Sequence, residues 1–451
     1  MPFGALSTRS SYAEHVNPQW VRLLDLLDMN VRYEHCAGAE LFAENGDRYL
    51  DFLSGYCVHN TGHNHPRIIK ALKDELDRRG PAMLQSHVPE LAGELAERLC
   101  TLAGGKLSKV FFASSGSEGV ETAIKFTRAA TGRDALLYAE GAFHGLTCGA
   151  LSLMDNAFWR AGFGPLLPHT DAVPFNDLDA AEKKLQTKKF AAFFLEPIQS
   201  EGGIKLPSSD YLQQVQALCK RYGTLLVLDE VQTGMYRTGK FLAAHHYGVE
   251  PDVVILAKAL SGGLVPVAAV LMTDKVNEAV YSSLKRAIVH TSTFSENGLA
   301  MRAGLATLDV LEDERLAERA GYLGELLRSR LRETLGGYEM FKDAPGLGLL
   351  SGIEFQPPSR LSLRLSYEAF RAIHPGMFGQ MLVMRLFRRE KILTQICGNN
   401  FMVLKSAPPL VVSEAQLEEF VAAVGRVVAD FHESTAFWTD ALALGRRTMD
   451  I

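Results

Sequence analysis

The sequence predicts an α/β fold, in which a large domain with a mostly parallel sheet flanked by helices is joined to a smaller α+β domain. Up to about residue 297, short apolar runs alternate with helical patterns, which is typical of parallel strands linked by crossover helices. Beyond that point helical patterns dominate. The 451 residues also exceed one ordinary core. We expect an N-terminal segment (1–65) that joins the smaller domain, a large domain (66–320) and a C-terminal domain (321–451).

The strands of the large domain are predicted from short apolar runs, and the run that begins at Leu225 indicates burial on both faces. These runs lie at 109–113, 135–139, 190–195, 225–229, 252–256 and 266–272. Between them, a helical pattern spans 118–128, and another spans 209–222 with Ser209 as a plausible N-cap. In the C-terminal part, strand-like runs lie at 347–355, 392–396 and 401–405.

Composition excludes several classes of protein. Hydrophobic content of 47% and charged content of 22% are ordinary for a globular chain. A net charge of −5 without a basic block argues against a nucleic-acid binder. The six cysteines form no CxxC pair, which suggests neither a disulfide framework nor a zinc site. Because no run of 18 uncharged apolar residues occurs, we expect a soluble, cytoplasmic protein.

Two carboxylates end one buried strand. The apolar run from Leu225 leads directly into Asp229 and Glu230. Burying an unpaired charge is expensive, so a cation is expected beside the strand end. In open α/β sheets, ligands bind beyond the carboxyl ends of the strands. Asp229 therefore marks a candidate ligand site, although such an Asp is often only a turn or helix cap. Glu230 may serve structure alone.

A lysine and a small-residue loop are candidate partners. Lys258 follows an apolar strand and precedes a Gly pair, so lost hydration should lower its pKa and free its amine as a nucleophile. The loop Ser115, Gly116 and Ser117 opens a helix, where backbone N–H groups can hold an anion. A surface lysine and a plain serine N-cap are the alternatives. Together with Asp229, however, the three features describe a pyridoxal-phosphate site.

The segment LVLDEVQTGMYRTGKF, followed by PDVVILAKALSGG, resembles the signature of the class III aminotransferases. These are fold type I pyridoxal-phosphate enzymes that include ornithine, putrescine and 4-aminobutyrate transaminases. The resemblance continues, in order, through FLSGYCVHNTGHNHP, SSGSEGVE, GAFHGLTCGALS, FFLEPIQSEGG, HTSTFSENGLA and LKSAPPL. It implies pyridoxal 5′-phosphate as cofactor. The implied activity transfers an amino group from a primary amine or ω-amino acid to an oxo acid such as 2-oxoglutarate or pyruvate.

The resemblance implies two catalytic residues. Lys258 would bind the cofactor covalently and then move the proton at the substrate carbon. Asp229 would pair with the protonated pyridine nitrogen. At ~4 Å and an effective dielectric of about 20, such a pair is worth roughly 4 kcal/mol, enough to keep the ring cationic at neutral pH. The cation expected beside the strand end would then be the cofactor itself.

Further cofactor contacts are carried over by position. Ser115, Gly116 and Ser117 would hold the phosphate, Phe143 would stack on the ring, and Gln232 would contact the ring hydroxyl. His144, beside Phe143, and Glu196 also fall at cofactor-side positions. Thr293 would reach the phosphate of a neighbouring subunit, which implies a homodimer. The chain departs from its relatives in that loop, where it has Glu296 and Gly298 and they usually have Gly and Pro.

Three residues bear on the substrate. Relatives acting on 4-aminobutyrate or ornithine carry a carboxylate-binding arginine at the position of Leu146, so that clamp is missing. Lys405 stands where many relatives have a second arginine, and we expect it to pair with the gating residue Glu201 when no acid is bound. The resemblance therefore implies a long amine donor, such as a diamine or the side-chain amine of ornithine or lysine. Trp20 and Tyr56 are expected near the substrate entrance, to which the segment 1–65 contributes.

No metal is expected. His59, His63 and His65 have a spacing that can suggest a metal site, but the family carries a similar GHxHP as a turn, with Pro66 at the first helical position. Three other functions stay open, and the first is a 4-aminobutyrate or acetylornithine transaminase. A pyridoxal aminomutase or lyase on the same fold would need no oxo-acid acceptor. A non-catalytic oligomer would lack the yellow colour of the bound cofactor.

Overall fold

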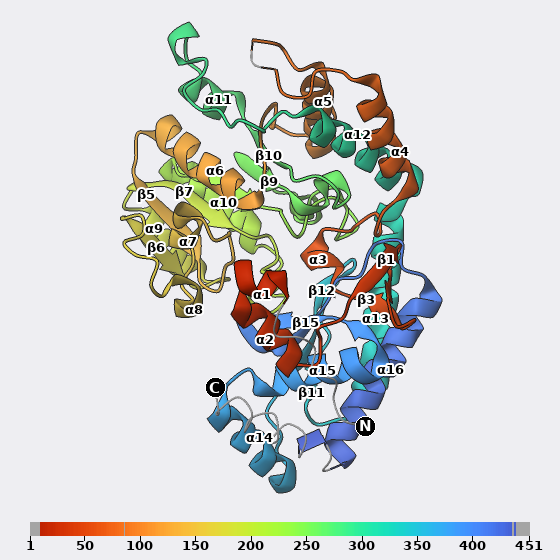
Figure 1. Cartoon of the computed structure of the whole chain (residues 1–451). Coiled ribbons are helices and arrows are strands. Elements are labelled where there is room, and N and C mark those ends of the chain that lie inside the picture. The colour runs from red at the N-terminus through yellow and green to blue at the C-terminus, as the bar shows by residue number, and fades with distance from the viewer. Residues whose placement is uncertain (1–9, 85, 435–436, 439–451) are drawn as a thin grey trace.

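A computed structural model describes residues 10–84, 86–434 and 437–438 (Figure 1). Its largest sheet has seven strands in the order β4-β10-β9-β8-β7-β5-β6. Strand β10 is antiparallel to both of its neighbours, and the other pairs are parallel. The strands are β4 (Lys109–Ala113), β5 (Ala135–Ala139), β6 (Thr170–Val173), β7 (Phe190–Leu195), β8 (Leu225–Asp229), β9 (Val253–Leu256) and β10 (Ala268–Met272). The predicted mostly parallel sheet is confirmed.

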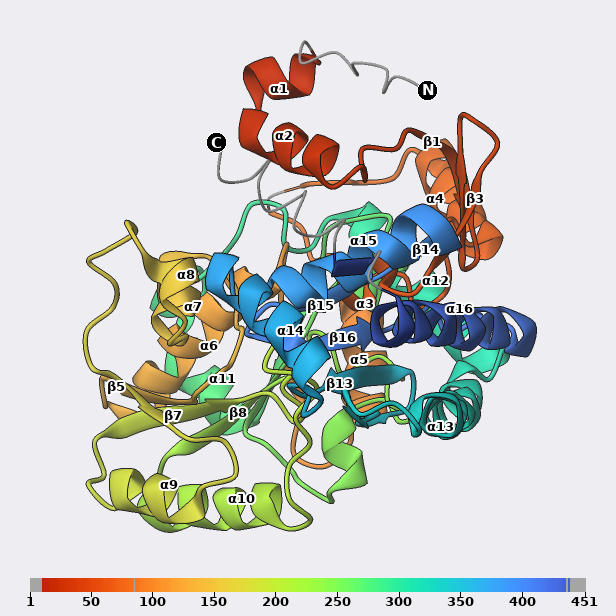
Figure 2. The same ribbon diagram turned by 90° about the horizontal axis from the view of Figure 1, so that it is seen from below.

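Helices cover both faces of this sheet. Figure 2 shows α9 and α10 on one face and α6 and α7 on the other. Along β8, Leu228 packs in the same core as Val215 of α10, whereas Val227 packs with Phe126 of α6. The alternation confirms that this strand is buried on both faces. The helices of this part are α3 (Ser54–Cys57), α4 (Pro66–Arg78), α5 (Glu90–Ala103), α6 (Gly116–Thr131), α7 (Cys148–Ser152), α8 (Ala157–Arg160), α9 (Leu178–Leu185), α10 (Tyr211–Tyr222), α11 (Asp274–Val280) and α12 (Gly298–Asp313).

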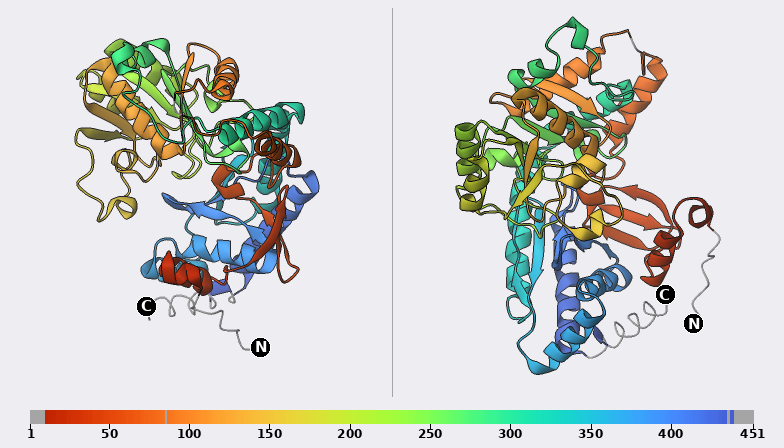
Figure 3. Two further views of the ribbon diagram at one scale, coloured as in Figure 1. Left: turned by 45° about the horizontal axis from the view of Figure 1, so that its top comes forward. Right: turned by 90° about the vertical axis from the view of Figure 1, so that its left-hand side faces the viewer.

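Two smaller sheets join the ends of the chain. One has the order β1-β2-β3-β14, and the other has the order β11-β13-β16-β15 with β12 beside β13. Because Ile392 of β14 pairs with Leu50 of β3, the N-terminal strands lie against the C-terminal part (Figure 3). Their strands are β1 (Tyr33–Ala37), β2 (Glu40–Ala43), β3 (Arg48–Asp51), β11 (Phe341–Asp343), β12 (Gly346–Leu347), β13 (Leu350–Phe355), β14 (Ile392–Leu393), β15 (Gln395–Cys397) and β16 (Asn400–Ser406). This pairing supports our proposal that residues 1–65 join the smaller domain.

The remaining helices surround these two sheets. They are α1 (Ser11–His15), α2 (Pro18–Leu26), α13 (Leu316–Leu335), α14 (Leu361–Ile373), α15 (Met377–Glu390) and α16 (Glu414–Glu433). Within the described residues, no helix combines the length and apolarity that a membrane span requires.

Three predicted elements need correction. Helix α10 begins at Tyr211 rather than Ser209, because a turn in which the Tyr211 N–H donates to the Ser208 carbonyl precedes it, and Asp210 takes the N-cap position. The run 347–355 is split by a tight turn into β12 and β13. The run 392–396 is also split at Thr394, and its halves join different sheets. Apolar runs that bend sharply cannot be told from continuous strands by periodicity alone.

Candidate functional site

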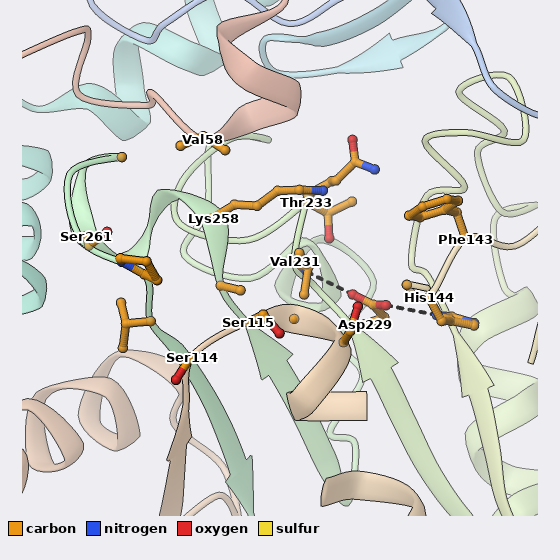
Figure 4. A pocket seen from close by; sticks show the side chains of 18 of the residues that line it. Val58, Ser114, Ser115, Phe143, His144, Asp229, Val231, Thr233, Lys258 and Ser261 are labelled. Carbon is orange, nitrogen blue, oxygen red and sulfur yellow. Dashed lines mark hydrogen bonds and ion pairs between the residues drawn. The ribbon is translucent and has the colours of Figure 1, made fainter. Parts of the chain in front are cut away.

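A cavity of about 520 Å³ opens at the carboxyl ends of β8 and β9. Its lining includes Ser115, Phe143, Asp229, Val231, Gln232 and Lys258, all but Val231 predicted from the sequence. In Figure 4, the side chains of Lys258, Val231, Asp229 and Phe143 surround the same space. The strand-end position agrees with the rule for ligands in α/β sheets.

Asp229 is buried at the base of the cavity and has a histidine partner. Its Oδ2 lies 2.8 Å from His144 Nδ1, and its Oδ1 accepts a hydrogen bond from the Val231 N–H at 3.1 Å. Burial lowers the pKa of His144, but the hydrogen bond and charge of Asp229 outweigh burial and raise it overall. The protein itself therefore supplies one hydrogen-bonding partner for this acid. Sequence reasoning assigned His144 only to the cofactor and missed this contact.

Lys258 enters the cavity directly after β9. It begins a short 3-10 helix, Lys258–Ser261, with φ +48°, a left-handed conformation uncommon outside glycine. Such backbone conformations cluster at functional sites, where the surroundings hold them. Burial is the main cause of a lowered pKa at Lys258. A larger share of its amine is consequently unprotonated near neutral pH, as nucleophilic chemistry requires.

The loop before α6 provides both a serine N-cap and backbone N–H groups that can bind an anion. Ser115 is the N-cap, and its Oγ accepts a hydrogen bond from the Glu118 N–H. The N–H groups in the first turn, at Gly116 and Ser117, lack intrahelical acceptors and lie at the cavity, where an anion can accept from them. Gly145 has φ +123°, and a Cβ there would lie 2.1 Å from Ser117 Oγ. Only glycine lets the 141–145 turn approach this loop so closely.

A buried ion pair lies beside the cavity. Lys405 on β16 is fully buried, and its Nζ contacts Glu201 Oε1. Gln232 donates to the same oxygen at 3.3 Å, and the Gly398 N–H donates to Glu201 Oε2 at 2.8 Å. The Tyr56 ring faces Lys405 Nζ at 5.2 Å. We call Glu201 and Lys405 the gate pair.

Electrostatics keeps the gate pair ionised. Burial raises the pKa of Glu201, but the charge and hydrogen bond of Lys405 outweigh burial and lower it overall. Burial likewise lowers the pKa of Lys405, and Glu201 raises it well above its usual range. Removing one member would leave an uncompensated buried charge, which is strongly destabilising. The pair expected from the sequence is thus present, held by three further groups.

Two other glutamates fix backbone near the site. Glu196 accepts hydrogen bonds from the N–H groups of Phe143, at 3.0 Å, and Ser200, at 3.1 Å, and burial raises its pKa to about 7. It therefore positions the loop that carries Phe143. Glu230 points away into the core, where it accepts from the N–H groups of Ala243 and Ala244, so its contacts are structural.

Two predicted residues lie outside this cavity. Thr293 is exposed and borders a separate cavity with Leu84 and Ile288. The Leu146 side chain is 55% exposed, and its N–H donates to Ser117 Oγ at 3.3 Å. Neither side chain therefore contributes to the cavity of its own chain.

The histidine-rich segment has local structural contacts. His63 Nε2 lies 2.7 Å from Asp51 Oδ2, and His59 stacks on His63. His65 caps α4, which begins at Pro66 as predicted. Among the described residues, no group of three or more His, Cys, Asp or Glu side chains is arranged to hold a metal ion.

Comparison with known proteins identifies the family. The model of the class-III aminotransferase family matches residues 26–428. The chain is 38% identical to the putrescine aminotransferase of Pectobacterium atrosepticum, over 90% of this chain and 85% of that protein. It is 35% identical to the aminotransferase PigE of a Serratia species, over 93% of this chain but only 53% of that protein. This chain belongs to the class-III aminotransferases.

A solved structure supports the same assignment. The ornithine aminotransferase of Toxoplasma gondii superposes with a TM-score of 0.80 at 30% identity, covering 89% of this chain and 90% of that one. Class-III aminotransferases use pyridoxal 5′-phosphate, and this chain is a pyridoxal-phosphate-dependent transaminase with the fold type I architecture.

The cavity fits this cofactor. The first turn of α6 suits a phosphate, Val231 and Phe143 offer apolar surface to a flat ring, and Asp229 and Lys258 reach the same space. The buried Nε2 of His144 has no protein partner among the described residues, so it is free to bond a water or ligand. When bound, the cofactor supplies an electron sink for a substrate carbanion.

Proposed function

We propose that this transaminase takes its amino group from a long primary amine, either a diamine or the side-chain amine of ornithine or lysine. The acceptor is an oxo acid such as 2-oxoglutarate or pyruvate. The observation that carries the proposal is Leu146, an exposed aliphatic residue where a carboxylate clamp would need a cation. The described residues that line the cavity include no arginine to replace it.

The donor side of the proposal follows from this missing cation. 4-Aminobutyrate ends in a carboxylate alone and gains no ionic contact at Leu146, whereas a diamine carries no carboxylate and the far end of ornithine or lysine is a zwitterion without net charge. The 38% identity to a putrescine aminotransferase supports a diamine.

The acceptor side rests on the gate pair. With an amine donor bound, Glu201 stays on Lys405 and no charge is left unpaired. With an acidic oxo acid bound, Glu201 moves aside and the acid carboxylate pairs with Lys405, as a point charge rather than a bidentate clamp. One buried lysine thereby serves two substrates of different charge.

The chain contributes proton transfer and orientation to the reaction. Lys258, with its lowered pKa, takes the proton from the substrate carbon and returns it. Asp229, held by His144 and the Val231 N–H, offers a fixed negative charge to the cofactor ring. Phe143, held by Glu196, shields the site from water.

A donor panel tests the substrate class. We expect kcat/KM for putrescine, ornithine or a longer primary amine to exceed that for 4-aminobutyrate by at least about 10-fold, since one ionic contact is worth ~1.4 kcal/mol or more. Leu146→Arg should narrow this ratio by raising the rate with 4-aminobutyrate. A clear preference of the wild type for 4-aminobutyrate over every diamine and longer amine would refute the donor assignment.

The acceptor is tested at Lys405. Lys405→Ala should raise the KM for 2-oxoglutarate by about 10-fold or more, and Lys405→Arg should keep it near or below the wild-type value. Lys342→Ala is the matched control, since Lys342 is an exposed lysine of β11 paired with Glu354. An unchanged oxo-acid KM in Lys405→Ala would rule out the acceptor site.

A further inference from the structure

The turn between β15 and β16 contacts the gate pair. Its Gly398 N–H donates to Glu201 Oε2 at 2.8 Å, and its Asn399 N–H donates to the Glu201 carbonyl at 2.9 Å. The turn thus binds both the side chain and the backbone of Glu201. When the Glu201 side chain leaves Lys405, the bond from the Gly398 N–H to its Oε2 must break or move with it, while the bond from Asn399 keeps the turn attached to the Glu201 backbone.

The side chain of Asn399 binds the opposite wall of the site. Its Nδ2 donates to the carbonyls of Gly141 and Ala142, at 3.0 and 3.2 Å. Its Oδ1 accepts from Asn156 Nδ2 at 2.7 Å and from Trp159 Nε1 at 3.2 Å. An amide has two donors and two acceptor lone pairs, so all four are used. A fully used amide between two separate segments fixes their relative position.

Trp159 carries these contacts to the cofactor side. Its ring meets that of Phe143 edge-on, with centroids 5.5 Å apart and an interplanar angle of 79°. We call Phe143 and Trp159 the aromatic wall. Gly398 fits between this wall and the gate pair. A Cβ at Gly398 would lie 3.2 Å from Glu201 Oε2 and 3.5 Å from the Trp159 ring. The turn that hydrogen-bonds Glu201 therefore also contacts the aromatic wall.

We propose that Asn399 is a positioning residue that couples the gate pair to the aromatic wall. The proposal rests on the proposed function, in which Glu201 moves when an acid binds Lys405. With Asn399 in place, the turn holds Gly398 N–H on Glu201 and favours the closed pair. The closed pair strengthens binding of a donor amine, which needs Glu201 on Lys405. It weakens binding of an oxo acid, because the acid must displace Glu201 before it pairs with Lys405.

Loss of this coupling should act oppositely on the two substrates. In Asn399→Ala the closed pair is held less firmly, so the KM for 2-oxoglutarate should fall and the KM for the amine donor should rise. Each change is expected at about 2- to 10-fold, the effect of losing one or two hydrogen bonds. General damage to the site would instead raise both KM values. Asn45→Ala, in the exposed turn between β2 and β3, is the matched control and should change neither.

A binding experiment with an unreactive ligand measures the coupling between the gate pair and the aromatic wall without catalytic turnover. The chain has three tryptophans, so the holoenzyme labelled with 5-fluorotryptophan gives three fluorine resonances, and Trp159→Phe identifies one. Titration with glutarate, an unreactive dicarboxylate, should shift the Trp159 resonance as Glu201 opens. In Asn399→Ala, glutarate should bind as well or better, while the Trp159 shift falls to less than about half. Asn45→Ala should keep the wild-type shift.

The outcomes separate the two proposals. If calorimetry shows that glutarate does not bind the wild type, the acceptor site at Lys405 is wrong and the coupling falls with it. If glutarate binds but the Trp159 resonance is unmoved, or moves equally in Asn399→Ala, the coupling alone is refuted. Should Asn399→Ala fail to fold, Asn399→Asp replaces it. That variant keeps the acceptors for Asn156 and Trp159, loses the donations to Gly141 and Ala142, and should shift both KM values in the same opposite directions.

Discussion

Buried charges at this site are compensated one by one. Asp229 has His144, and Glu201 has Lys405, each partner far away in the sequence. Lys258 instead relieves its burial through a lowered pKa. Because a buried charge is costly, Asp229 and Glu201 each have a partner, and Lys258 is left with an amine that is more easily deprotonated. The amine is the group left to react.

Lys258→Ala should abolish transamination, leaving less than a few per cent of wild-type turnover, because its lowered-pKa amine is the proton carrier. The protein should still fold and hold pyridoxal 5′-phosphate non-covalently through the first turn of α6. Activity with an amine and an oxo acid measures the loss, and dialysis measures the weakened retention of the cofactor. Lys183→Ala on the exposed side of α9 is the matched control. Substantial turnover of Lys258→Ala without added amine would exclude this role.

Asp229→Asn should slow proton abstraction from the donor by about 10² or more. An uncharged amide cannot stabilise a cationic ring, and it also weakens the contact with His144. The rate of the amine half-reaction in a single turnover is the measurement. Asp179→Asn, an exposed change of the same type on α9, should leave that rate unaltered. A near-normal rate in Asp229→Asn would mean that another group fixes the ring charge.

Physical reasoning alone predicted residues of the site only where the local sequence carries a pattern, whereas Phe143, Glu196 and Gln232 were predicted from the family resemblance. Asp229 and Lys258 end apolar runs, and Ser115 opens a helix, so each stands at a recognisable boundary. The contact of His144 with Asp229 joins residues 85 apart, and no periodicity reports such a pairing. Asn399 is equally invisible in sequence, because its four partners come from two distant segments.

At the scale of elements, uniform apolar runs predicted the central strands almost to the residue. Strands β4, β5 and β7 have the expected bounds. In β5 and β7 every residue is buried and the apolar pattern is unbroken, whereas β4, at the edge of the sheet, is buried only at Phe112 and Ala113. The C-terminal runs misled because each contains a bend. At Thr394 the side chain bonds the Lys405 carbonyl, and the chain passes from one sheet to another. Tertiary contacts, not local pattern, decide such bends.

The loop after β8 carries a pH-sensitive contribution to stability. Burial raises the pKa of Glu230 from 4.5 to about 7, so the folded protein holds this proton more tightly than the unfolded chain does. Stability from this group is therefore lost as pH rises from about 4.5 to 7, by up to roughly 3 kcal/mol, and is constant above that range. This direction is opposite to that of the usual ion-paired carboxylate.

Glu230→Gln removes this titration. Its free energy of unfolding should be lower than that of the wild type at pH 5, because an amide cannot accept every hydrogen bond of the carboxyl group. The difference should shrink as pH rises to 8, because only the wild type is penalised by ionisation. Urea denaturation across that range measures it. Glu278→Gln on the exposed side of α11 should follow the wild type, and a difference independent of pH would contradict the assignment.

At the scale of the whole molecule, the family resemblance implies a second subunit. Large apolar side chains are exposed around the cavity that Thr293 borders: Leu84 by 63% and Ile288 by 82%. Exposed apolar groups gathered beside a cavity mark interaction surfaces. Thr293 does not reach the Lys258 cavity of its own chain. We therefore propose that the partner of this surface is a second copy, whose site receives Thr293.

Leu84→Asp combined with Ile288→Asp should yield a monomer with at least about 10²-fold lower activity, because two charges would be buried in the proposed interface. Light scattering measures the mass. Leu361→Asp is the matched control, since Leu361 is 70% exposed on α14, and it should keep the wild-type mass and activity. If the double variant remained a dimer with full activity, the interface would not include Leu84 and Ile288.

Thr293→Ala should leave the dimer intact but weaken pyridoxal 5′-phosphate about 10-fold, the value of one hydrogen bond to a charged group. Mixing tests whether the effect crosses between subunits. In a dimer of one Thr293→Ala chain and one Lys258→Ala chain, the site that keeps Lys258 receives an intact Thr293 from its partner. That site should regain wild-type affinity and turnover at limiting cofactor. If Thr293 acted within its own chain, the one site of the mixed dimer that keeps Lys258 would retain the weakened affinity for the cofactor.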